Sequence, residues 1–187
     1  MRFLRCRYAA ARGRRHVLTA AALAFAAAMA AAGGASAQVG PVQRTFINLG
    51  FEEPNLQTSG CRVYIGEQFV PGWATTHGLH GQENVGGCVV PSGFVVGQQA
   101  NIIELWRTPR TNGGLTVVAR EGAQLAELNA EQLSRLSQNV CLVQNEQIRW
   151  RFSHRGRQSS TVRDEMRFLI GSDPIVHVGT TNTGVGG

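Results

Sequence analysis

Residues 38–187 contain no lysine, and the signature motifs of several enzyme classes are missing from the whole chain. There is no Gly-x-Ser-x-Gly elbow, no phosphate-binding loop, no dinucleotide fingerprint and no His-Glu-x-x-His pair. These absences argue against elbow-type hydrolases, nucleotide-dependent enzymes and zinc peptidases. Without lysine every cation is a planar guanidinium, which suits carboxylates and stacked aromatic faces, although a GC-rich coding bias is the simpler explanation.

The first 37 residues are typical of a secretory signal peptide. A head with six arginines precedes an alanine-rich apolar run over residues 17–32, and Ala35-Ser36-Ala37 forms a small-x-small cleavage site. The run is short for a membrane span; an uncleaved N-terminal anchor is the alternative. We expect a secreted or periplasmic protein, or one at the cell surface. The expected parts are the signal peptide (1–37), a β-sandwich domain (38–180) and a flexible tail (181–187).

Removal of the signal peptide changes the charge of the protein. The whole chain has 18 arginines, 12 acidic residues and a net charge of +6. Six arginines and no acidic residue lie in the first 37 residues, so the remainder is neutral. Long-range attraction to polyanions is therefore not expected, and neither nucleic acid nor a membrane is an expected partner. The sequence does not indicate an oligomeric state.

Three cysteines follow the signal peptide, an odd number for an oxidising compartment. We expect a Cys61–Cys88 disulfide across a Gly-rich loop, which contributes about 3 kcal/mol on the loop-entropy scale. Cys141 would then be a buried free thiol, and a bridge from it to either loop cysteine is the alternative. Their spacing matches no zinc site, and we attribute His77 and His80 to a polar loop.

Polar turns separate short segments in which apolar and polar residues alternate, the pattern of half-buried β-strands. The segments expected to form strands are 44–51, 62–65, 73–76, 102–107, 115–119, 124–130, 148–153, 162–170 and 174–180. Short strands with polar, Gly-containing turns predict an all-β fold, an antiparallel sandwich or jelly roll.

The clearest alternation predicts a β-hairpin between residues 148–153 and 162–170. Trp150, Phe152 and Phe168 would lie on its apolar face, opposite a charged face. Residues 129–137 support a short helix as well as a strand, because their apolar residues recur at helical spacing.

Glu104 and Glu127 each occupy the centre of an expected strand. Two carboxylates in such positions can cleave glycosides as acid and base, ligate calcium or bond sugar hydroxyls. Salt bridges to nearby arginines are the purely structural alternative. Their separation cannot be obtained from sequence alone.

Aromatic and imidazole side chains add further candidates. Trp73 and Trp106 can stack on a pyranose ring or fill the core. His154 and Asp164 continue the inward alternation of the hairpin, which makes them diagonal neighbours. They form either a structural pair or the rim of a groove that Arg155 reaches over.

Five short sequence motifs, in a fixed order, give the chain a resemblance to a known family. They are Gly50-Phe51-Glu52-Glu53-Pro54, Val70-Pro71-Gly72-Trp73, Ile103-Glu104-Leu105-Trp106, Glu121 to Ala130, and Ser153-His154-Arg155-Gly156-Arg157, followed by Asp164-Glu165-Met166. With them the chain resembles bacterial secreted β-sandwich domains of the galactose-binding-like or jelly-roll type. It is more distantly similar to plant cell-wall-associated sandwich domains, which share the Pro-Gly-Trp and the Glu-Gly turn.

The resemblance implies a noncatalytic module that binds carbohydrate or cell-wall polymer, with a strand over residues 134–141. Relative to that pattern, the excursion between Cys61 and Cys88 is longer, and we expect the final strands of the sandwich to be missing. We expect a ligand face with Trp73, Glu104, Trp106, Glu127 and Asn129, and with His154, Arg155 and Asp164 at one end. No cofactor is expected apart from a structural calcium ion. The alternatives are a glycan hydrolase or esterase that uses Glu104, Glu127 and His154, and a surface adhesion or structural domain.

Overall fold

A computed structural model describes residues 43–156, 163–171 and 173–182. The expected signal peptide lies outside the described residues. No helix in the described part is long and apolar enough to cross a membrane.

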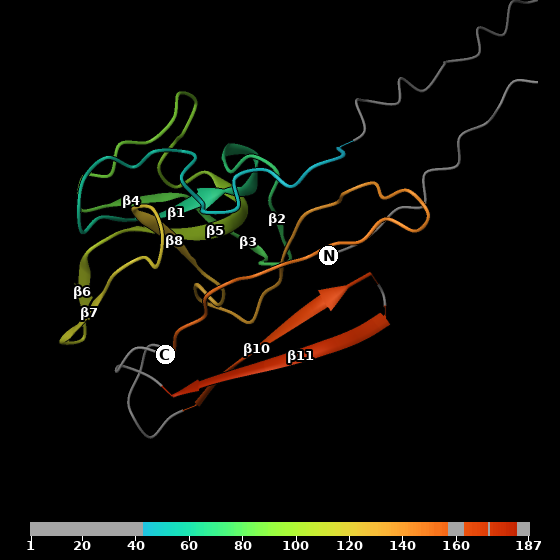
Figure 1. The fold of residues 1–187 in the computed structure, drawn as a ribbon. Helices are drawn as coiled ribbons and strands as arrows, with labels where there is room; N and C mark the ends of the chain where they lie inside the picture. Colours follow the sequence, from blue (N-terminus) through green and yellow to red (C-terminus); the bar gives the residue numbers. More distant parts are fainter. Residues whose placement is uncertain (1–42, 157–162, 172, 183–187) are drawn as a thin grey trace, which may run out of the picture.

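The regular secondary structure of the described residues is all β apart from one 3-10 turn, η1 (Glu67–Phe69). The largest sheet has five antiparallel strands: β3 (Leu79–Gly81), β5 (Gln99–Arg107), β1 (Arg62–Gly66) and β4 (Glu83–Val85) in that order, with β8 (Gln124–Glu127) also paired to β5. The sheet curls in Figure 1, with β5 as its longest strand. The all-β class and the antiparallel pairing are therefore confirmed.

Three two-stranded ladders complete the regular structure. They are β2 (Ala74–Thr75) with β9 (Leu136–Ser137), β6 (Arg110–Asn112) with β7 (Leu115–Val117), and β10 (Arg163–Ile170) with β11 (Asp173–Asn182). Gly113 and Gly114 connect β6 to β7 at φ values of 59° and 80°, which a residue with a Cβ rarely adopts. In Figure 1 the β10–β11 hairpin lies on the opposite side of the large sheet from the segment that precedes β1.

The main core covers one face of β1 and β5. Val63, Ile65, Ile103 and Leu105 point to this face because strand side chains alternate, and each is at most 1% exposed. The segments before β1 and after β4 cover them. We call this side of the large sheet the core face.

The Cys61–Cys88 disulfide lies in this core, as expected, and joins residues 27 positions apart. The prediction that Cys141 is a free thiol is wrong, because that cysteine is also disulfide-bonded. The odd number of cysteines after residue 37 therefore leaves no free thiol among the described residues.

Two predicted strand arrangements are wrong. Residues 44–51 form no strand, and β10 pairs with β11 instead of with residues 148–153. Alternation shows which side chains share a face, but it does not identify the strand that supplies the backbone ladder. The shared aromatic face is nevertheless present, because Trp150 and Phe152 both stack on Phe168.

Residues 129–137 are not helical. Ala130 has a φ of 30°, outside the helical range, and Leu133 is 89% exposed, so the expected apolar stripe has nothing to pack against. The two-residue strand β9 ends this stretch.

Candidate functional site

The face of the large sheet opposite the core carries a line of polar side chains. Tyr64 on β1 is paired with Glu83 on β4 and with Glu104 on β5, and Glu104 is paired with Glu127 on β8. Directly opposed residues point to the same face, with Cβ atoms about 4.5–5.5 Å apart. We call these four residues the glutamate row. The two glutamates singled out from sequence are therefore direct neighbours.

Arg62 and Trp106 compensate the buried charge at the centre of the row. Glu104 is 1% exposed; its Oε1 accepts a hydrogen bond from the Trp106 indole at 2.7 Å and lies 3.5 Å from Arg62 Nη1. The Arg62 guanidinium also lies 4.8 Å from the Tyr64 ring centre. A buried carboxylate requires such partners. Trp106 is also only 1% exposed. Its ring is therefore packed inside the protein, whereas stacking on a sugar would require the ring to face solvent.

A second group of polar side chains extends the row toward the β3 end of the sheet. His80 on β3 stands edge-on to the Tyr64 ring at 5.5 Å, and its Nε2 lies 2.6 Å from Oε2 of Glu131, in the loop after β8. Nδ1 of His80 also contacts a carbonyl, the oxygen of Gly81. Both ring nitrogens of His80 therefore lie within hydrogen-bond distance of an oxygen atom. The polar side chains that are at least partly exposed here are those of Arg62, His80, Glu83, Glu127 and Glu131.

Tyr64 remains a neutral phenol across the physiological range. Burial raises its pKa to about 12, and the negative charge of Glu104 adds to this effect. The Arg62 guanidinium acts in the opposite direction, while Glu131 and Glu127 raise the pKa further. Tyr64 can therefore donate a hydrogen bond but cannot act as a phenolate.

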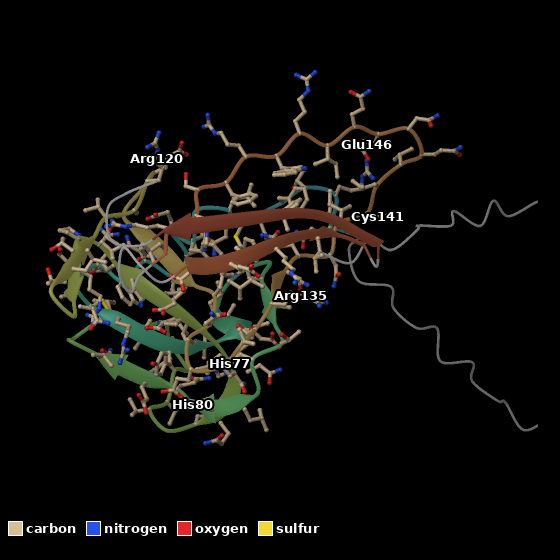
Figure 2. The ribbon with its side chains drawn as sticks, turned by 90° about the horizontal axis from the view of Figure 1, so that it is seen from below. His77, His80, Arg120, Arg135, Cys141 and Glu146 are labelled. Carbon is tan, nitrogen blue, oxygen red and sulfur yellow. A yellow bond between two sulfur atoms is a disulfide. The ribbon has the colours of Figure 1, made fainter. Side chains whose placement is uncertain are left out.

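Two buried side chains lie near this group: His77, which was expected in a polar loop, and Gln82, which no sequence pattern singled out. His77 is 3% exposed; its Nδ1 contacts Gly78 and Gln132, whereas its Nε2 has no hydrogen-bond partner among the described residues. Gln82 is 0% exposed, and within the described part of the chain neither the nitrogen nor the oxygen of its side-chain amide has a hydrogen-bond partner. His77 and His80 lie together at one end of the molecule (Figure 2). No group of three or more potential ligands in the described residues could hold a metal ion.

Trp73 lies away from the glutamate row, on the core face. Its ring stacks on Phe51 at 4.6 Å, and its indole donates to the Asn48 carbonyl at 2.8 Å. Its contacts with Phe51 and Asn48 thus hold Trp73 on the side of the sheet opposite the glutamate row. Asn129 is exposed just after β8, close in sequence to Glu127.

His154, Arg155 and Asp164 belong to a third region, beside β10. Burial lowers the pKa of His154, and the Asp164 carboxylate partly offsets that shift, which indicates that the two groups are near each other. The residues expected to form one ligand face are thus divided among the glutamate row, the core face and this third region.

Comparison with known proteins adds no relative: no protein-family model, no curated protein and no solved structure matches the chain. Its function must therefore be argued from the geometry above.

Proposed function

We propose that this chain is an exported, noncatalytic module that binds carbohydrate on the face of the glutamate row. The observation that carries the proposal is the pairing of Glu104 with Glu127, flanked by Arg62, on one face of three adjacent strands. Sugar hydroxyls donate to carboxylates and accept from the N–H groups of guanidinium and imidazole side chains, so such a face offers both kinds of partner.

The accessible end of the row provides the contacts. Glu127 and Arg62 are partly exposed, and His80 and Glu131 continue the polar surface beyond Tyr64. Glu104 acts as a positioning group, because its charge holds Arg62 and Trp106 in place. The Cys61–Cys88 disulfide is typical of proteins from oxidising compartments, where extracellular polysaccharides occur.

Binding is favoured over hydrolysis because Glu104 is shielded from solvent. A retaining glycosidase requires two carboxyl groups about 5–5.5 Å apart, both in contact with the glycosidic bond. Neighbouring strand positions approach that spacing, but the carboxylate of Glu104 is buried and engaged by Trp106 and Arg62. Only Glu127 of this pair is partly exposed.

Affinity electrophoresis and titration calorimetry with a panel of soluble polysaccharides test the proposal. Glu127→Gln keeps the side-chain shape and removes the charge, and we expect it to weaken binding about tenfold, the value of one charge-assisted hydrogen bond. The matched control is Glu53→Gln, an exposed glutamate outside the row. A wild-type protein that binds none of the polysaccharides, or equal effects of the two variants, would contradict the proposal. Release of reducing ends would favour the hydrolase.

A further inference from the structure

Three glutamine side chains are buried in the described part of the chain, and their amides are treated differently by the fold. The oxygen of the Gln124 amide accepts from a backbone N–H, and its nitrogen donates to a backbone carbonyl. The Gln138 amide makes the same two kinds of bond. Gln82 is 0% exposed, and its amide has no hydrogen-bond partner among the described residues. An unpaired buried amide costs free energy, which a ligand that bonds it would recover.

The Gln82 amide lies on the same face of the large sheet as the glutamate row. Gly66 follows Tyr64 by two positions on β1, so the two residues point to one face. A methyl group on Gly66 would collide with the amide ends of both Gln82 and Gln68, a residue of η1. The missing side chain at Gly66 thus leaves space for the two amides beside Tyr64.

The floor next to this amide is apolar. Ile102 opposes Gly66 in the β1–β5 ladder and therefore points to the same face. Ile102 is 0% exposed and packs with Tyr64 and Ala100, and Ala130 from the loop after β8 packs against them. We call Gln82, Gly66, Ala100 and Ile102 the amide subsite. It offers one N–H donor group and one carbonyl acceptor beside apolar side chains, and none of its members is charged.

We infer that the amide subsite takes the acetamido group of an N-acetylated amino sugar bound along the glutamate row. An acetamido group has one N–H, one carbonyl and a methyl group. The N–H donates to Oε1 of Gln82, the carbonyl accepts from Nε2, and the methyl group packs on Ile102. The inference rests on the proposed carbohydrate-binding function and adds a substrate class to it.

Gln68 is the cover of the amide subsite. Its side chain is exposed and ends above Gly66, next to the amide of Gln82. Exposed side chains change rotamer within nanoseconds. Rotation of Gln68 therefore opens the subsite to a ligand while the strands stay in place.

Other sugar substituents match the amide subsite less well. A hydroxyl group can bond the amide of Gln82 but leaves the apolar floor uncovered. An ammonium or carboxylate group would bury a charge beside Ile102 without a counter-ion in the subsite. The glutamate row would in addition repel an acidic sugar.

Titration calorimetry of the full chain with chitopentaose and cellopentaose tests the inference. The two oligomers share their β-1,4 linkage and differ in carrying an acetamido group or a hydroxyl group at each ring. We expect chitopentaose to bind about tenfold more tightly, as two additional neutral hydrogen bonds predict. Gln82→Met keeps the side-chain length and should remove this preference without changing cellopentaose binding. The urea midpoint of this variant should stay the same or rise, because an unpaired amide is removed.

Two further variants are the controls. Gln138→Met removes a buried amide that is bonded to Ile47, so it should lower the urea midpoint and keep the preference for chitopentaose. Gln68→Ala removes the cover and should strengthen chitopentaose binding several-fold.

The outcomes separate this inference from the proposed function. Equal affinities for the two oligomers, both reduced by Glu127→Gln, overturn the amide subsite alone. Absence of sugar binding by the wild type overturns both proposals. A preference that Gln82→Met retains, or a fall in its urea midpoint as large as that of Gln138→Met, shows that the amide serves the fold and overturns the subsite.

Discussion

The indole of Trp106 donates a hydrogen bond to Oε1 of Glu104 at 2.7 Å, and each residue is about 1% exposed. The same oxygen lies 3.5 Å from Nη1 of Arg62. One carboxylate thus connects an indole on its own strand to a guanidinium on the neighbouring strand. This contact explains how a charged side chain can be buried in the middle of the sheet.

Trp106→Phe should lower the free energy of unfolding by about 2–4 kcal/mol. The substitution removes a hydrogen bond to a buried charge and leaves a small cavity. Trp73→Phe is the matched control, because the Trp73 indole donates to a neutral carbonyl in a half-buried position. We expect a loss of about 1 kcal/mol there. Urea unfolding at neutral pH measures both values, and equal losses would contradict the role assigned to the Glu104 contact.

Tyr64 should make stability depend on pH above the neutral range. Its pKa is raised to about 12 in the folded protein, from 10.0. The stability contributed by the neutral phenol is therefore complete below pH 10 and is lost as pH rises toward 12. Over this interval the wild type should lose about 2–3 kcal/mol relative to Tyr64→Phe.

Urea titrations of the wild type and Tyr64→Phe at several pH values provide the measurement, and phenolate absorbance reports the ionisation directly. Tyr8 is the other tyrosine of the chain, so the step that disappears in Tyr64→Phe belongs to Tyr64. Parallel stability curves for the two proteins would show that Tyr64 is not buried beside the carboxylates.

Much of the large sheet can be predicted from sequence because its signals are local. Alternation within residues 62–65, 102–107 and 124–130 locates β1, β5 and β8, although β8 is shorter than expected. The disulfide is also predictable, since Cys61 and Cys88 flank a loop without periodicity.

The composition of the candidate site is harder to predict, because it depends on register and on tertiary partners. Glu104 opposes Glu127 only because β5 and β8 pair in one particular register, which strand patterns leave open. Trp73 and Trp106 look alike in sequence, yet Phe51 holds the first on the core face and Glu104 holds the second on the other face. Gln82 is buried, and its side-chain amide has no hydrogen-bond partner among the described residues. No pattern in the sequence predicts this burial.

The pairing of β10 shows the same limit. The alternation in residues 163–170 is compatible with two partners, and the ladder forms with β11 and not with residues 148–153. Because side-chain contacts do not require backbone pairing, Trp150 still reaches Phe168. The correct face was therefore predicted with the wrong strand partner, and the exposure of Trp150 follows from that difference.

His154 and Asp164 allow a direct test of the third region. Burial lowers the pKa of His154 below its ordinary value of 6.5, and the Asp164 carboxylate raises it. Asp164→Asn should therefore lower the pKa further, because burial is then less opposed. Nuclear magnetic resonance titration of the imidazole Cε1 protons measures the pKa, and His154→Gln assigns the signal.

The sign of the pH effect on stability follows from the same shift. The folded state prefers neutral His154, so its contribution is present above pH 6.5 and is lost as pH falls toward the lower folded-state value. Asp164→Asn should make that loss extend further into the acidic range, since the folded pKa is then lower. Glu165→Gln, at an exposed neighbouring position on β10, is the matched control and should change the His154 titration less. An unchanged imidazole titration in Asp164→Asn would show that the carboxylate is too distant to act on His154, and the two residues would then no longer count as one pair.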